Sequence, residues 1–157
     1  CQLAVEQINE VRPIQYLAEL SQIEFEQVKS AITDEIAHRR ARHVVGEVQR
    51  TKDAVEALQQ GNIEKFGLLM NQSHISLRDD YEVTGLHLDT LAEAAWKVDG
   101  VLGSRMTGGG FGGCTVSLVR EEAIPMFIEQ VGAEYKEKTG LVVDFYIAEI
   151  GDAHRVL

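Results

Sequence analysis

The sequence has 157 residues, 45% of them apolar, which suffices for one globular domain and is unlike a disordered, collagenous or coiled-coil chain. Its net charge of −10 repels nucleic-acid phosphates and anionic lipids, which argues against a nucleic-acid or membrane-surface partner. Two cysteines, Cys1 and Cys114, lack any metal-binding spacing, so we expect a reduced, cytoplasmic protein. Because the chain starts in a helical pattern and without a methionine, we expect a piece of a longer protein, called the parent protein below.

The first two-thirds of the sequence predict helices. A short helix is expected at 2–10 and a second at 21–32, where Ser21 and Glu24 form a capping box. Apolar residues at helical spacing across 33–60 predict a long third helix.

Two further helices follow. Asn62 is placed to cap one that ends near 78–80, and Thr84 to cap another with Trp96 on its inward face. The start of each helix is predicted from a polar capping residue before an apolar run.

The third helix carries the one basic cluster, Arg39, Arg40 and Arg42. We interpret it as a solvated face, since the chain as a whole is acidic. His38 and His43 lie five residues apart and so do not share the face that a helical metal site needs.

The pattern changes to strands after residue 100. Strands are predicted at Val101–Thr107 and Cys114–Val119, then a helix at 121–138 and a third strand at 141–150. Cys114 is expected to be a buried apolar residue of the second strand. The order of elements predicts the α+β class.

A glycine-rich turn, Thr107–Gly113, joins the first two strands. It matches G-x-G-x-x-G at Gly108, Gly110 and Gly113, but a strand follows where the dinucleotide fingerprint requires a helix. A P-loop is excluded because no Gly-Lys-Ser/Thr follows. Two interpretations remain: a turn that presents backbone N–H groups to an anion, or a tight hairpin without a ligand.

The residues around this turn resemble a known family. Gly-Ser-Arg-Met-Thr-Gly-Gly-Gly-Phe-Gly-Gly-Cys at 103–114 is similar to the third signature motif of the GHMP small-molecule kinases. A phenylalanine at this place within the glycines resembles the motif of the galactokinase branch of that family. Further strings resemble the same branch: 77–84, 88–91, and 42–45 with Glu47 and Arg50.

The resemblance implies a fold and a reaction. Residues 1–157 would form a single ferredoxin-like GHMP-kinase C-terminal domain with additional N-terminal helices. The parent protein would transfer the γ-phosphoryl group of ATP, with Mg²⁺, to the 1-hydroxyl of α-D-galactose. The implied cofactor-binding residues, beside the ATP phosphate site, are Thr107, Gly108, Gly109, Gly110, Phe111, Gly112 and Gly113, with Arg105 as a further candidate.

The family's sugar-binding motif, serine-rich phosphate loop and catalytic aspartate are absent from the chain. The resemblance therefore implies no catalytic residue and no metal ligand here, and ATP and Mg²⁺ would be held mainly by an N-terminal domain. Phosphoryl transfer needs these parts together, so we expect the chain alone to be inactive. Other GHMP kinases, acting on N-acetylgalactosamine, homoserine or mevalonate, and a non-catalytic galactose-sensing regulator remain alternatives, as does a ligand-binding domain of another class with a ferredoxin-like sheet.

Three polar residues outside the turn have two interpretations each. Arg105 would either offset phosphate charge or pair with Asp79 or Asp80, and we favour the pair. Tyr81 and His74 would either line a cleft or belong to the interior, and we favour a half-buried tyrosine and a hydrogen-bonded histidine.

Overall fold

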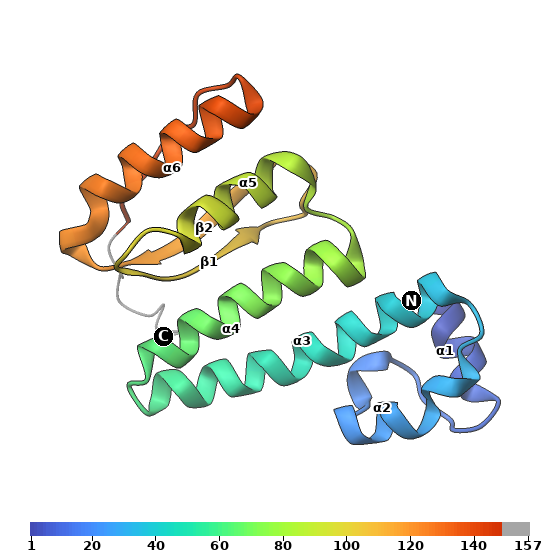
Figure 1. Cartoon of the computed structure of the whole chain (residues 1–157). Coiled ribbons are helices and arrows are strands. Elements are labelled where there is room, and N and C mark those ends of the chain that lie inside the picture. Colours follow the sequence, from blue (N-terminus) through green and yellow to red (C-terminus); the bar gives the residue numbers. More distant parts are fainter. Residues whose placement is uncertain (149–157) are drawn as a thin grey trace, which may run out of the picture.

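A computed structural model describes residues 1–148. Figure 1 shows its helices and a two-stranded hairpin. The elements are α1 (Gln2–Asn9), α2 (Gln22–Val28), α3 (Glu35–Gln59), α4 (Ile63–Ser76), α5 (Gly85–Trp96), β1 (Val101–Thr107), β2 (Cys114–Val119) and α6 (Ile124–Thr139). Short 3₁₀ turns span Leu17–Glu19, Lys29–Ala31 and Glu121–Ala123, and a π-helical turn, the π turn, spans Leu77–Tyr81. No helix within 1–148 is both long and apolar enough to cross a bilayer.

The N-terminal helices pack on one end of α3, as Figure 1 shows. Their core is apolar, and its most buried members are Ala4, Ile8, Leu20, Ala41 and Val45. The predicted capping box is confirmed, because Ser21 and Glu24 hydrogen-bond reciprocally at the start of α2. The Ser21 backbone N–H, the Arg12 guanidinium and the Ser21 hydroxyl lower the pKa of Glu24 to about 2.

Helices α3 and α4 run side by side and are joined by a short turn (Figure 1). The Asn62 side chain accepts a hydrogen bond from the Lys65 backbone N–H, so the predicted cap of α4 is confirmed. Thr84 precedes α5 as predicted, but its side chain makes no capping hydrogen bond.

The hairpin pairs β1 with β2 antiparallel, with Ser104 opposite Ser117 and Thr107 opposite Cys114. Helix α4 covers the other edge of β1, where the Ser104 N–H donates to Asn71 Oδ1 at 2.8 Å. A Cβ on Gly67 of α4 would overlap the backbone of Leu102, so glycine permits this close approach.

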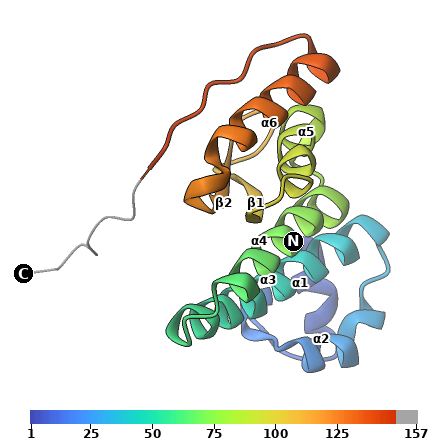
Figure 2. The same cartoon turned by 60° about the vertical axis from the view of Figure 1, so that its left-hand side comes forward.

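Helix α5 packs against both strands of the hairpin, and α6 packs on α5 (Figure 2). The interior here is apolar, with Leu91, Ala95, Val98, Val131 and Tyr135 among its buried residues. Gly140 ends α6 with a positive φ of 74°, the usual C-terminal role of glycine.

The predicted third strand is wrong over 141–148, which form no regular secondary structure; residues 149–150 lie outside the described part. The alternation behind the prediction is nevertheless real. Val143 and Phe145 pack on the interior formed with α6, and the Phe145 ring meets Phe127 edge-on at 5.8 Å. Within 1–148 no strand pairs with this segment, and a strand needs a neighbouring strand to bond to.

The prediction that Cys114 is buried is also wrong: it is exposed, as is Val116 two residues along β2. The inward face of β2 instead carries Ser117, whose hydroxyl lies 2.8 Å from that of the fully buried Ser104. Helices within 1–148 cover that face and leave the apolar one open. The α+β class with additional N-terminal helices is confirmed.

Candidate functional site

The glycine-rich turn, Thr107–Gly113, depends on an unusual backbone. The φ angles of Gly108, Gly110, Phe111 and Gly112 are positive, at 79°, 84°, 57° and 99°. Glycine adopts positive φ readily, whereas other L-residues pay roughly 1 kcal/mol or more for it. Three of the five glycines in the turn therefore follow from the path of the backbone.

The turn also leaves backbone donors available. Between residues 108 and 113, the Phe111 N–H is the one amide with a backbone carbonyl partner among residues 1–148, donating to the Val83 oxygen at 2.8 Å. The five glycine amides have no such partner in that part of the chain. Successive backbone N–H groups in turns of this kind form anion-binding concavities, so the donors that a phosphate needs are present.

Val83 fixes the turn at close range. A Cβ on Gly110 would overlap the Val83 carbonyl oxygen, so this position admits only glycine without a shift of the backbone. The Phe111 side chain points to solvent and is 81% exposed. The turn is thus held by its main chain and not by its aromatic ring.

Val83 follows the π turn, which the arginines of α3 bind. Arg39 and Arg40 donate to the Glu82 carboxylate at 3.0 and 2.6 Å. They also donate to the carbonyl oxygens of Asp79 and Asp80. Hydrogen bonds from Arg40, and to a smaller extent from Arg39, lower the pKa of Glu82. The interpretation of the cluster as a solvated face is therefore wrong for Arg39 and Arg40, because each has a defined partner some 40 residues away in the chain, whereas the Arg42 side chain is 54% exposed.

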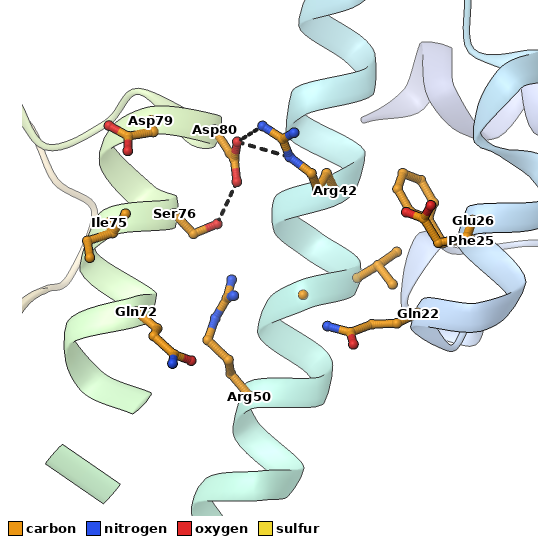
Figure 3. Close-up of a pocket in the computed structure, with 12 residues that line it drawn as sticks. Gln22, Phe25, Glu26, Arg42, Arg50, Gln72, Ile75, Ser76, Asp79 and Asp80 are labelled. Carbon is orange, nitrogen blue, oxygen red and sulfur yellow. Dashed lines mark hydrogen bonds and ion pairs between the residues drawn. The ribbon is translucent and has the colours of Figure 1, made fainter. Parts of the chain in front are cut away.

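A cavity of about 560 Å³ opens beside the π turn, between α2, α3 and α4. Figure 3 shows Arg42 and Ser76 directed at the Asp80 carboxylate, and Arg50 lying between α3 and α4. Arg50 pairs with Glu47 of the same helix. The acidic and basic groups at this cavity are thus largely paired with one another, and the glycine-rich turn is not among the residues that line it.

Arg105 does not form the predicted pair with Asp79 or Asp80. Asp79 pairs with Arg78, and Asp80 with Arg42. The Arg105 Nε donates to the neighbouring Met106 carbonyl at 3.1 Å, and none of the ion pairs formed within 1–148 includes it. The favoured structural interpretation of Arg105 is therefore wrong.

His74 is a fully buried node between α4, α5 and β1. Its Nδ1 accepts the Met106 backbone N–H at 3.0 Å, so Nε2 carries the proton that faces Asp89 at 3.1 Å. Trp96 packs edge-on against the ring at 5.6 Å. The prediction of a hydrogen-bonded histidine is confirmed, as is that of a half-buried Tyr81, whose ring packs at a tilt against that of His43.

Acid is expected to destabilise the folded chain from about pH 6.5 downward. Burial lowers the pKa of both His74 and His43 below 6.5, against the opposing charges of Asp89 and Glu47 respectively. Between the folded and unfolded pKa values the unfolded state binds more protons, so stability is complete above pH 6.5 and falls as pH drops through the folded pKa.

Denaturant unfolding of the parent protein at pH 7.5, 6.5 and 5.5 measures this effect. His74→Asn, which removes one of the two titrating groups, is expected to flatten the decline below pH 6.5. An equal pH dependence in the variant and the wild type would contradict the assignment of His74.

The sequence did not predict the contact between Val83 and the turn, or the ion pairs of the neighbouring Glu82. In the sequence, Glu82 and Val83 belong to the string 77–84 that resembles the family, and Arg39 and Arg40 resemble a charged surface. The one local signal is a largely acidic string, 79–82, which ends three residues before a helix that starts with glycine. Its pairing with α3 is a long-range contact without a local signature.

Comparison with known proteins finds several galactokinases that are similar to this chain. It is 59% identical over 154 residues to a galactokinase of Fusobacterium nucleatum, covering 97% of this chain and 39% of that protein. It is 54% identical over 155 residues to a galactokinase of Clostridium beijerinckii, covering 99% and 40%. The crystal structure of Lactococcus lactis galactokinase complexed with galactose matches with a TM-score of 0.92 at 51% identity, covering 96% of this chain and 39% of that one.

The chain thus spans about 40% of the length of these relatives. The structural match agrees with the fold that the sequence motif implied. Residues 54–137 match the family model for the C-terminal domain of GHMP kinases. More than half of the chain lies within that match, so the chain belongs to the GHMP kinase family and carries its C-terminal domain.

Proposed function

We propose that the parent protein is a cytoplasmic galactokinase, which transfers the γ-phosphoryl group of ATP to the 1-hydroxyl of α-D-galactose and forms galactose 1-phosphate. Identity of 54–59% over nearly the whole chain to proteins named galactokinase carries this proposal. Residues 1–157 would form one domain of that enzyme.

In this proposal the glycine-rich turn binds next to the ATP phosphates. Its unpaired glycine amides supply donors, and the positive φ angles let them approach an anion without intervening side chains. Arg105, with no carboxylate partner within 1–148, would add positive charge near the turn. ATP would supply the reactive phosphoryl group and Mg²⁺ would neutralise its charge, and both would be held mainly by the remainder of the parent protein.

The partner of this domain would be the N-terminal domain of the same enzyme. The exposed apolar residues Cys114 and Val116 of β2, next to the turn, support such a contact. Galactose and ATP would bind where the two parts meet, which places the turn at the edge of that site.

Galactose-dependent ADP release by the parent protein, with Mg·ATP, tests this function. We expect turnover with galactose and none with N-acetylgalactosamine, homoserine or mevalonate. Turnover with another alcohol would keep the family and change the substrate. A folded parent protein that binds ATP or galactose and turns over none of them would support a regulator built on this scaffold.

The isolated chain is the matched control. It is expected to release no ADP above the ATP-only background, since positioning and charge neutralisation in phosphoryl transfer need several parts together. Galactose-dependent turnover by residues 1–157 alone would contradict the proposed division of labour between the two domains.

A further inference from the structure

Two non-glycine residues within 1–148 have positive φ, and both lie at one hydrogen bond: Phe111 is its donor, and Glu82 directly precedes its acceptor. Glu82 has φ 58° and ψ 47°, and Phe111 has φ 57°. The Phe111 N–H donates to the carbonyl of Val83, the residue directly after Glu82. Left-handed backbone at non-glycine residues is unfavourable and persists where its surroundings impose it.

The surroundings of Glu82 are two arginines of α3. Its two carboxylate oxygens bind different guanidinium groups, Arg39 at 3.0 Å and Arg40 at 2.6 Å. The Arg40 guanidinium also lies 5.6 Å from the centre of the Tyr81 ring. This arrangement, the Glu82 clamp, therefore holds both the side chain of Glu82 and the main chain just before it.

We infer that the Glu82 clamp positions the glycine-rich turn: Arg39 and Arg40 hold Glu82 in its left-handed conformation, which aims the Val83 carbonyl at the Phe111 N–H. Glu82 and the two arginines are positioning residues, because they act on the turn through Val83. The role of the Glu82 clamp in catalysis rests on the proposed function, whereas its effect on the conformation of the turn does not.

A purely structural role makes a different prediction. The Glu82 side chain is 46% exposed, and ion pairs of this exposure contribute little to global stability. Misplacing a group that binds the reacting phosphates, by contrast, lowers the rate strongly. Loss of the clamp should therefore change the turn and the kinetics while leaving the melting temperature nearly unchanged.

The test compares Glu82→Gln with Glu134→Gln in the parent protein. Glu134 is a fitting control, since its carboxylate also binds two cations, Lys97 and Lys138, but on α6. Hydrogen exchange of a peptide that covers 107–113 reports on the Phe111 amide, and steady-state kinetics report kcat/KM for ATP and KM for galactose.

In Glu82→Gln we expect faster exchange of the turn and about a 10-fold loss in kcat/KM for ATP, with KM for galactose and the melting temperature unchanged. The double variant Arg40→Gln/Glu82→Gln should lose less than the sum of the two single losses, because both single changes remove the contact between Arg40 and Glu82. Glu134→Gln should match the wild type in both readouts.

Unchanged exchange of the turn in Glu82→Gln would overturn the inference. So would a loss of melting temperature with full kcat/KM in the folded fraction, which indicates a structural role. If the wild-type parent protein showed no turnover with galactose, the proposed function would fail, and the exchange comparison would still decide whether the clamp holds the turn.

Discussion

Replacing Gly110 with alanine is expected to lower kcat/KM for ATP in the parent protein about 100-fold. The alanine Cβ would overlap the Val83 carbonyl oxygen, and the φ of 84° disfavours any L-residue. Relief of the overlap must move the turn away from Val83 and so break the bond from the Phe111 N–H. Displacement of phosphate-binding amides by about 1 Å is enough for a loss of this size.

Gly61→Ala is the matched control. Gly61 has a similar φ of 68°, but a Cβ there would meet nothing within 4 Å. It lies between α3 and α4, away from the turn, so any loss measures the effect on activity of a strained φ elsewhere in the fold. Kinetics for both variants, with ATP and galactose varied in turn, separate the overlap from the φ effect. Activity of Gly110→Ala within threefold of Gly61→Ala would show that contact with Val83 does not matter.

The helices could be predicted from the sequence because their signals are local. Ser21 with Glu24, Asn62 and Gly140 mark helix ends where the structure has them, since each acts on backbone groups a few residues away. The strands β1 and β2 and the turn between them followed from the same kind of short-range pattern.

Strand partners and strand faces could not be predicted in this way. Val143 and Phe145 alternate as in a strand, yet alternation does not reveal whether a neighbour is present to pair with. In β2 the apolar Cys114 and Val116 point outward, because the helices of 1–148 cover the face that carries Ser117. Which face is covered depends on the rest of the fold.

The candidate site shows the same division. The glycines identified the turn, since their density has no other simple cause. The Glu82 clamp joins residues more than 40 positions apart, and both sides resemble ordinary charged surface in the sequence. Only the fold brings them together, through the side-by-side packing of α3 and α4.

Replacing His74 with alanine is expected to destabilise the parent protein by about 3–5 kcal/mol. The side chain is fully buried, so the change leaves a cavity against Trp96. It also leaves the Met106 N–H and the Asp89 carboxylate without their shared partner. His38→Ala is the control: His38 is half-buried on α3 against Phe25, and its loss should amount to less than about 1 kcal/mol.

His74→Asn separates the two roles of the ring. The asparagine Oδ1 takes the place of Nδ1 and keeps an acceptor for Met106, while the contact with Asp89 is lost. Met106 directly precedes the turn, so a retained bond should preserve kcat/KM at a loss of about 1–2 kcal/mol in stability. Denaturant unfolding and kinetics on the same preparations give both values. If asparagine proved as damaging as alanine to stability, the bond to the β1 edge would not be the contact that matters, and the pair with Asp89 would be.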